Sequence, residues 1–338
     1  MNYRRIKKIM ILLILVVFIT QQGCSSKTKT VNQEDSYVNQ ESNTNIDSNI
    51  DENKNINTEK NIEEKTKNTI NTDKDNTETN RFDVEEMFTD RDKEIGYEES
   101  TAIPIILKDN LSQCDSSLVS ISENKVIIKG EGTFLLSGKL TNGQIIIDAE
   151  KTEKLHLIFD GVEIHCDTSA PLYIRQADKV FITLEQGTEN ILSNEEEFIV
   201  IDDNNIDAAI FSKEDVTFNG NGSLKVTSTG HGIVSKDDLV FTGGSYEIEA
   251  KEHAVNGKES VRIANGSFEI TAEEDGIHAK DKDDASLGFV YIAGGDFKIT
   301  AGDDGIHADN SVVITDGTIT VLESYEGIEG LNIEISNG

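Results

Sequence analysis

The hydrophobic and polar positions of this chain repeat at a regular spacing between residues 221 and 338. A turn residue followed by glycine marks each repeat, at Gly222, Gly244, Gly266, Gly295, Gly317 and Gly338. The separations are 22, 22, 29, 22 and 21 residues, and the second and fourth positions after each complete marker are apolar, as in Tyr246 and Ile248. A second apolar marker recurs in step, at Ile233, Val255, Ile277, Ile306 and Ile328. Markers that move together over this length define a structural repeat.

Apolar and polar residues alternate with the two-residue period of a β-strand. Each repeat is long enough for two or three short strands joined by glycine turns. Such a unit buries its apolar face only by stacking on its neighbours. The sequence therefore predicts an all-β fold, a single-stranded parallel β-helix with about 22 residues per coil. A leucine-rich solenoid is excluded because its leucines and its helical half are missing, and nine-residue calcium-binding repeats do not fit this period.

The N-terminus has the pattern of an export signal. Four basic residues between positions 4 and 8 precede an apolar run from Ile9 to Ile19, which is too short to span a bilayer. Gly23 and Cys24 follow and resemble a bacterial lipoprotein cleavage box, although Gln21 stands where that box usually has leucine. We expect residues 1–23 to be a signal peptide and Cys24 to carry lipid, which would anchor the exported protein on the cell surface. Secretion without an anchor is the alternative.

The rest of the chain divides by composition. Residues 24–100 are rich in Asn, Thr, Asp, Glu and Lys without periodicity, which predicts a disordered polar tether, with a short helix within residues 81–100. Residues 101–338 are long enough for one solenoid core and are predicted to form the folded domain. The sixth repeat begins at Gly338 without a capping element, so we expect the natural chain to continue beyond it.

The charge balance narrows the possible partners. The chain has 63 acidic and 31 basic residues and a net charge of −32, which argues against nucleic acid and anionic membrane surfaces as partners. It allows cation binding. Cys114 and Cys166 remain after Cys24, and the sequence leaves open whether they form a disulfide or stay as free thiols.

Acidic residues fill neighbouring rows of the repeat. Stacked coils place equivalent positions about 4.8 Å apart, so columns of the aligned repeats become rows in space. The acidic members are Glu274, Asp275, Asp303, Asp304 and Glu326. Carboxylates at this separation repel one another unless a cation lies between them, and calcium is the hard cation that takes several oxygen ligands. We therefore expect calcium here. The alternative is that these acids are solvated in turns or paired with histidine and lysine.

Lysines form another row, three residues after each apolar marker. Its members are Lys213, Lys236, Lys258 and Lys280. An acid directly follows each lysine, so one interpretation is a self-neutralising ladder on a solvated turn, which adds little stability. In the other interpretation Lys236, Lys258 and Lys280, together with calcium, hold the carboxylates of an acidic polysaccharide.

Aromatic and histidine residues give weaker signals. Aromatic residues amount to 6% and tryptophan is absent, and those in strand phase, such as Phe268, are predicted to pack in the core. Exposed aromatic contacts are expected from Tyr173, Tyr291 and Tyr325. His278 and His307 are interpreted as turn-facing residues without a catalytic role, because no nucleophile or metalloprotease motif accompanies them.

Four motifs resemble a known family. They are LTNGQIIID at residues 140–148, DGVEIHCDTSAPLYI at 160–174, ADKVFITLEQGTENIL at 177–192, and the repeated DGIHA. Together they resemble the bacterial carbohydrate-binding surface proteins with a pectate-lyase-like, right-handed β-helix. The resemblance implies a non-catalytic protein that binds calcium and plant cell-wall glycans such as pectin, polygalacturonate or cellulose. It assigns calcium to Asp275 and Asp304, with Glu274 and Asp303 beside them. Residues 230–231 and 252–253 depart from that acidic pair, which argues against calcium in those coils.

Three functions remain open at this point. The first is a monomeric, calcium-assisted polysaccharide-binding protein on the cell surface, without catalysis. The second is a calcium-dependent polysaccharide lyase, in which Lys258 or Lys280 would act as the base near Asp275. The third is a passive stalk or adhesin without a glycan ligand.

Overall fold

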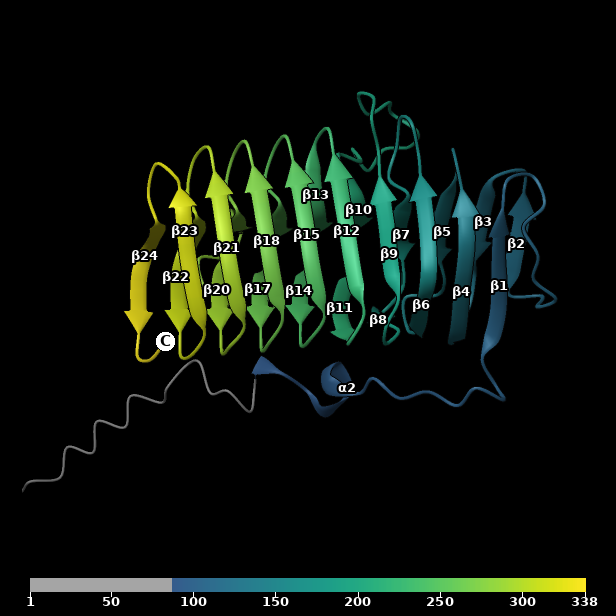
Figure 1. Ribbon diagram of the computed structural model, residues 1–338, viewed down its shortest axis with the longest axis horizontal. Helices are drawn as coiled ribbons and strands as arrows, with labels where there is room; N and C mark the ends of the chain where they lie inside the picture. Colours follow the sequence, from purple (N-terminus) through teal and green to yellow (C-terminus); the bar gives the residue numbers. More distant parts are fainter. Residues whose placement is uncertain (1–86) are drawn as a thin grey trace, which may run out of the picture. The chain divides into compact units, whose positions relative to one another are not determined.

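The structure is a computed structural model that describes residues 87–338. The predicted signal peptide, Cys24 and most of the predicted tether lie outside these residues. Within them no helix has the length and apolar character needed to cross a bilayer. The described part is all-β apart from α2 (Asp90–Lys93), a single helical turn (Figure 1).

The strands stack in three columns, and the chain visits the columns in turn (Figure 1). The first column contains β3 (Lys125–Ile128), β5 (Gln144–Asp148), β7 (Leu172–Gln176), β10 (Ala208–Ser212), β13 (His231–Ser235), β16 (Val255–Gly257), β19 (Ile277–Ala279), β22 (Ile306–Ile314) and β24 (Ile328–Ile335). The second contains β1 (Ile103–Lys108), β4 (Gly132–Leu140), β6 (Lys154–His165), β8 (Lys179–Leu184), β11 (Asp215–Gly220), β14 (Asp238–Phe241), β17 (Ser260–Ile263), β20 (Phe289–Ile292) and the ends of β22 and β24. The third contains the ends of β4 and β6, then β9 (Glu189–Ser193), β12 (Ser223–Ser228), β15 (Ser245–Ala250), β18 (Ser267–Ala272), β21 (Asp296–Ala301) and β23 (Thr318–Glu323). We call one passage through the three columns a coil.

Pairing between coils is parallel and follows the predicted register. Ile277 pairs with Ile306 in the first column, and Phe268 pairs with Phe297 in the third, across the 29-residue repeat. The described residues depart from parallel pairing at β2 (Val119–Ser122), which lies antiparallel to β3, and at the isolated bridge between Ile106 and Gln113. The predicted stacking of equivalent repeat positions is therefore confirmed, and sequence columns are spatial rows in this protein.

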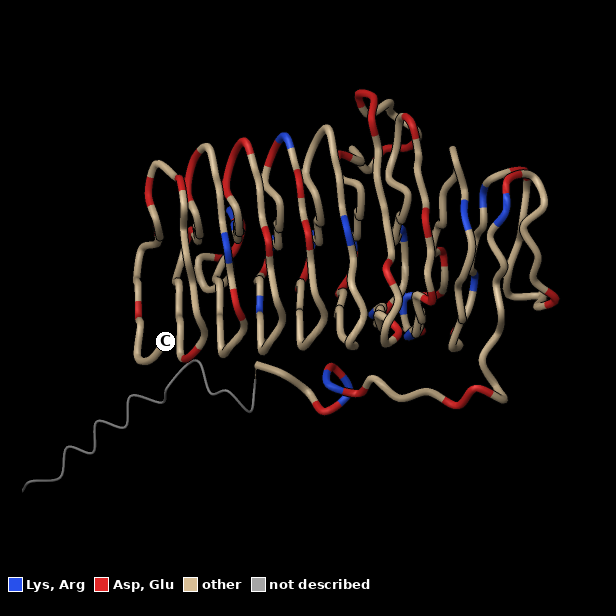
Figure 2. Tube along the Cα trace, viewed as in Figure 1, with Lys and Arg blue, Asp and Glu red and all other residues tan. Residues whose placement is uncertain are grey.

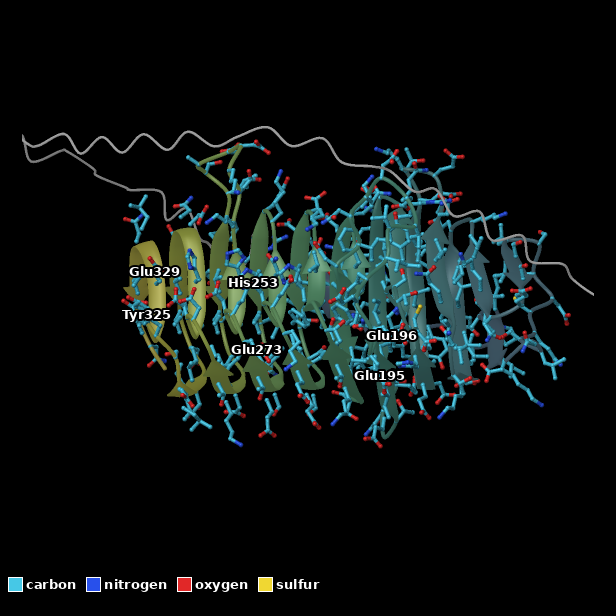
Figure 3. The ribbon with its side chains drawn as sticks, turned by 90° about the horizontal axis from the view of Figure 1, so that it is seen from above. Glu195, Glu196, His253, Glu273, Tyr325 and Glu329 are labelled. Atoms are coloured by element: carbon cyan, nitrogen blue, oxygen red, sulfur yellow. The ribbon has the colours of Figure 1, made fainter. Side chains whose placement is uncertain are left out.

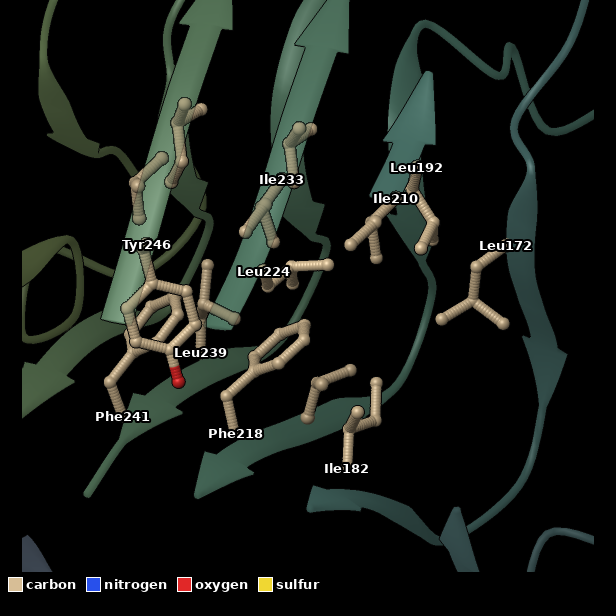
Figure 4. Close-up of a cluster of buried hydrophobic side chains, with 14 of the residues drawn as sticks. Leu172, Ile182, Leu192, Ile210, Phe218, Leu224, Ile233, Leu239, Phe241 and Tyr246 are labelled. Carbon is tan, nitrogen blue, oxygen red and sulfur yellow. The ribbon is translucent and has the colours of Figure 1, made fainter. Parts of the chain in front are cut away.

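Inward-facing side chains from the three columns form one continuous core. Phe218, Phe241 and Tyr246 meet at its centre, where the rings of Phe218 and Phe241 stack at 5.2 Å (Figure 4). Tyr246, Phe268 and Phe297 form a second stack with 4.8 Å between successive ring centroids, as expected for equivalent residues in neighbouring coils. The prediction that the strand-phase aromatic residues are core residues is confirmed.

The repeated glycine has a conformational cause. Gly244 has φ +99° and follows a turn residue directly before β15. Positive φ in this region strongly favours glycine, because a Cβ atom clashes with the backbone there. The same backbone occurs at the later markers, Gly266, Gly295, Gly317 and Gly338.

The folded part begins before the predicted boundary at residue 101. Phe88 is 3% exposed and packs with Val240 and Tyr291 on the outer face of the second column. Asp92 is also buried and contacts Lys179, with 2.8 Å between Oδ1 and Nζ. At least residues 87–94 of the predicted tether therefore belong to the domain, and the helix expected within residues 81–100 is present as α2. Residues 194–207 cover part of the outer face of the first column, where Phe198 and Ile206 pack against Phe211.

Candidate functional site

Two rows of polar side chains run along the first column. The turn row lies in the tight bends that lead into β13, β16, β19, β22 and β24, and consists of His231, His253, Asp275, Asp304 and Glu326. The strand row, three residues later in each coil, consists of Val234, Asn256, His278, His307 and Glu329. Figure 3 shows His253 and Glu329 in one line along the stacked coils.

The first four members of the turn row each accept a hydrogen bond from the backbone of the next coil. His231 Nδ1 accepts from the His253 N–H and His253 Nδ1 from the Asp275 N–H, both at 3.1 Å. Asp275 Oδ1 accepts from the Asp304 N–H at 2.9 Å, and Asp304 Oδ1 from the Glu326 N–H at 3.1 Å. These bonds satisfy backbone donors in the bends. They leave Oδ2 of Asp275 outside these backbone bonds, whereas Oδ2 of Asp304 lies 3.2 Å from His307 Nδ1.

Neighbouring histidine rings are in contact across both rows, stacked for the first two pairs and edge-on for His278 and His307. Ring centroids lie 5.1 Å apart for His231 and His253, 4.0 Å for His253 and His278, and 5.2 Å for His278 and His307. Burial, followed by the neighbouring histidines and lysines, lowers the pKa of His231 to about 3 and that of His278 to about 2. These two imidazoles are therefore neutral at physiological pH, the form in which a ring nitrogen can bind a metal.

Carboxylates gather at the C-terminal end of the rows. His307 Nδ1 lies 3.2 Å from Asp304 Oδ2 and 3.2 Å from Glu329 Oε2. Burial tends to raise the pKa of Asp304, but hydrogen bonding with Glu329 and Glu326 outweighs it and the pKa is lowered. Burial and Asp304 raise the pKa of Glu326, and hydrogen bonding to Asp304 raises that of Glu329. The pKa values of the three acids therefore shift in opposite directions, because contact with its two neighbours favours the ionised form of Asp304 and the protonated forms of Glu326 and Glu329.

The structure brings together only part of the predicted acidic set. Asp275 and Asp304 are buried and adjacent, and Glu326 reaches Asp304. Glu274 instead faces His253 Nε2 at 3.3 Å, and Asp303 is exposed at the bend. Contact with histidine, the predicted alternative, is found for Glu274 and also for Asp275 and Asp304, which lie 3.2 Å from His253 and His307 respectively.

Two members of the site, His307 and Glu329, were not predicted from the sequence. The interpretation of His278 and His307 as turn-facing residues is wrong. They lie on β19 and β22, and His278 is 7% exposed. Their shared position in the DGIHA motif was the available signal, because equivalent residues of neighbouring coils lie in contact.

The lysine row lines a groove beside the strand row. A cavity of about 310 Å³ is bounded by Val234, Ser235, Lys236, Asn256, Lys258, His278, Lys280, Lys282 and Asp283. Lys258 Nζ lies 3.2 Å from Asp283, and Lys280 Nζ lies 3.0 Å from Asp309. Lys258 and Lys280 thus pair with acids of the following coil, and Lys258 also lies 3.5 Å from Asp281, an acid of the predicted ladder. Glu259 is close to Asp237, Asp238 and Asp215 instead.

This groove is a local concentration of positive charge on an acidic chain. Figure 2 shows acidic residues distributed along the coils, with basic residues between them. Lys236 Nζ lies 5.2 Å from the centroid of the Phe211 ring, and this cation–π contact holds the ammonium group at the edge of the groove. Lys213, the first member of the predicted lysine row, does not line the cavity.

Aromatic side chains contribute little to this surface. Tyr173 and Tyr291 were expected to be exposed, but they are 1% and 0% exposed and pack in the clusters beneath residues 194–207 and 87–94. Tyr325, at 80% exposure, is the one of the three that meets the expectation. Cys114 and Cys166 are both free thiols.

The site therefore combines hard oxygen donors, neutral imidazoles and a lysine groove. The carboxylates of Asp304, Glu326 and Glu329 fit a hard divalent cation. The groove fits an anionic ligand that extends along the coils. These features lie side by side on the first column of an all-β stack of coils.

Comparison with known proteins identifies the family. Residues 122–332 match the carbohydrate-binding domain-containing proteins, and the chain belongs to this family. A carbohydrate-binding domain-containing protein of Acetivibrio thermocellus is 41% identical over 130 residues, which is 38% of this chain and 46% of the relative. The chain thus matches less than half the length of that relative.

A solved structure is also similar. It is the gadolinium derivative of a polysaccharide lyase-like protein from C. thermocellum, with a TM-score of 0.67 and 34% identity. The match covers 69% of this chain and 96% of that structure. The all-β fold described above is thus shared with a polysaccharide lyase-like protein.

Proposed function

We propose that this protein is a non-catalytic, surface-anchored polysaccharide-binding protein that recognises an acidic plant cell-wall glycan such as polygalacturonate. The observation that carries the proposal is the lysine-lined groove of about 310 Å³ on a chain of net charge −32 that belongs to a carbohydrate-binding family. A chain this acidic repels a polyanion except where a basic surface or a bound cation intervenes.

The fold we propose for this function is a right-handed parallel β-helix. Parallel pairing between strands 22 residues apart, as for Tyr246 with Phe268, supports it. A regular stack of coils presents Lys236, Lys258 and Lys280 in one line, which suits a ligand that itself repeats. Neutral cellulose is a weaker candidate, because exposed aromatic rings on which sugars stack are not found at the described groove.

Calcium is proposed as the second element of recognition. Asp304, Glu326 and Glu329 would supply its oxygen ligands, and Asp275 lies beside them. A bound calcium ion would cancel part of the negative charge near the groove. The lipid anchor at Cys24 would keep the domain at the cell surface. We propose that the domain acts as a monomer.

The lyase alternative requires a lysine base that loses its proton easily. Hydrogen bonding to Asp283, supported by Asp281, raises the pKa of Lys258, which opposes that role. Lys280 is held by Asp309 at 3.0 Å. Both contacts oppose proton abstraction by these lysines.

The test is binding of polygalacturonate to the full chain, measured by calorimetry with and without calcium. The Lys258→Gln/Lys280→Gln variant is expected to bind roughly 5- to 30-fold more weakly, since two charge contacts of about 0.5–1 kcal/mol each are lost. Lys125→Gln is the matched control, because Lys125 lines a different cavity of about 400 Å³ near Gln144 and Cys166. Its affinity is expected to equal that of the wild type.

Three results would overturn the proposal. Equal affinity of the double variant and the wild type would exclude the lysine groove. Accumulation of unsaturated uronate, followed by ultraviolet absorbance, would establish the lyase. Absence of binding to any acidic or cellulosic glycan, with or without calcium, would favour the passive adhesin.

A further inference from the structure

The donor atoms along the two polar rows change in kind from coil to coil. The turn row reads His231, His253, Asp275, Asp304, Glu326, so nitrogen gives way to oxygen towards the C-terminus. The strand row contributes imidazoles at His278 and His307 and a carboxylate at Glu329. Around Asp275 the two rows therefore combine nitrogen and oxygen donors, unlike the carboxylate cluster around Glu326 and Glu329.

Three side chains converge at that point. Asp275 Oδ2 lies 3.2 Å from His253 Nδ1 and 3.8 Å from His278 Nε2. One potential ligand atom from each of the three residues falls within 4.8 Å of the others. A tetrahedral zinc ion with bonds of 2.0–2.1 Å holds its ligands about 3.4 Å apart, so small side-chain rotations suffice to bind one.

Neighbouring groups hold these atoms in place. The Asn256 carbonyl oxygen, Oδ1, lies 3.1 Å from His278 Nδ1, which therefore carries the ring proton and leaves the Nε2 lone pair free. Asp275 is held through Oδ1, which accepts the Asp304 N–H, so that Oδ2 is free. Hydrogen bonds of this kind from outside the ligand set fix the orientation and tautomer of metal-binding residues.

The converging atoms are electron-pair donors that face one another. His253 Nδ1 accepts the Asp275 N–H at 3.1 Å, and the Asp275 carboxylate stands 3.2 Å from the same nitrogen. Lone pairs and a negative charge at these distances repel unless a cation or proton lies among them. Coordination through His253 Nδ1 would exchange that long backbone hydrogen bond for a metal bond.

We propose that His253, Asp275 and His278 bind a divalent transition metal of the zinc class, separately from the calcium ion proposed at the carboxylate cluster. Two imidazole nitrogens and one carboxylate oxygen suit zinc, cobalt or nickel, whereas calcium and magnesium take oxygen ligands. Water completes the coordination. Because His278 also lines the lysine groove, the metal adds positive charge beside it. The site stands on its own donors and does not require that a glycan binds.

The test is metal binding by the full chain without glycan. Zinc is titrated by calorimetry, and cobalt is titrated by its visible d–d absorption, which reports nitrogen–oxygen coordination. Wild-type protein is expected to bind one ion at this site, unaffected by a large excess of calcium. His278→Gln is expected to weaken zinc binding by more than about a hundredfold, and Asn256→Ala by about 10- to 100-fold through lost orientation. His165→Gln is the matched control, a half-buried histidine whose carboxylate partner is Asp167.

Folding of each variant is checked by thermal unfolding, and Asn256→Ala keeps the test decisive if His278→Gln does not fold. The proposal is overturned if zinc binds His278→Gln and Asn256→Ala as tightly as the wild type, if calcium displaces zinc at equal concentration, or if wild-type protein gives no cobalt absorption. Polygalacturonate affinity is measured on the same samples. If the protein binds zinc but not polygalacturonate, the proposed function is contradicted and the proposed metal site still stands.

Discussion

The buried ion pair between Asp92 and Lys179 holds residues 87–94 against the second column of strands, and its removal tests how strongly this segment is bound. Asp92 Oδ1 accepts from Lys179 Nζ at 2.8 Å and from Thr217 Oγ1 at 2.6 Å, and its Oδ2 accepts from the Thr89 N–H at 2.9 Å. Asp92→Asn keeps the shape of the side chain and removes the charge. Lys179, whose side chain is 12% exposed, then remains without its carboxylate partner.

The size of the effect follows from the pKa of Asp92. Burial tends to raise that pKa, but the contacts with Lys179 and Thr217 outweigh burial and lower it from 3.8 to about 2. A difference of roughly 1.8 units corresponds to ~2.4 kcal/mol of stabilisation at neutral pH. Because the folded-state pKa is depressed, this stabilisation is present above pH 3.8 and is lost as the pH falls towards about 2.

Residues 87–94 can open without unfolding the coils, so the measurement must be local. Hydrogen exchange of a peptide spanning residues 87–100, followed by mass spectrometry, is expected to be roughly 50-fold faster in Asp92→Asn than in the wild type at neutral pH. Asp90→Asn is the matched control, since Asp90 is an exposed acid in the same helical turn. It is expected to change exchange by less than about fivefold. Equal exchange in Asp92→Asn and Asp90→Asn would refute the reasoning.

Two further predictions concern the coils themselves. Phe268→Ala removes the middle ring of the Tyr246–Phe268–Phe297 stack, and is expected to lower the free energy of unfolding by about 3–5 kcal/mol in chemical denaturation; a loss below about 1 kcal/mol would mean that the stack is not a tightly packed core. Burial, followed by Asp237, Asp238 and Asp215, raises the pKa of Glu259 to about 7. The folded state therefore binds this proton more tightly than the unfolded chain, and stability should fall as the pH rises from about 4.5 to about 7. Thermal unfolding should show this fall in the wild type and a smaller one in Asp237→Asn, and an identical pH dependence in both would contradict the assignment.

The sequence predicted the arrangement of the coils because periodicity carries that information directly. Phe268 and Phe297 could be aligned across a 29-residue interval, since the apolar positions on both sides keep the same phase. In a parallel stack, residues that align in the sequence repeat lie next to one another in neighbouring coils. The rows that contain Asp275, Asp304 and the lysines were predicted for the same reason.

The attachment of residues 87–94 could not be predicted from local sequence. Phe88 and Asp92 stand in a polar stretch without periodicity, and their partners are far away along the chain. The Thr217 and Thr242 hydroxyl groups reach Asp92 over separations of 125 and 150 residues. The partners of Lys258 could not be read from its immediate neighbours either, because Asp281 and Asp283 lie in the following coil.

In the two polar rows, the atoms that stabilise the backbone can be told apart from the atoms that could bind a ligand. A bend in this stack requires one acceptor for the backbone N–H of the next coil, and histidine, aspartate and glutamate all carry one. His253 meets this need with Nδ1 and Asp304 with Oδ1. The side chains of the strand row, such as His278 and Glu329, can differ from coil to coil without any change in the backbone. Soft and hard cation sites can therefore lie one coil apart on the same scaffold.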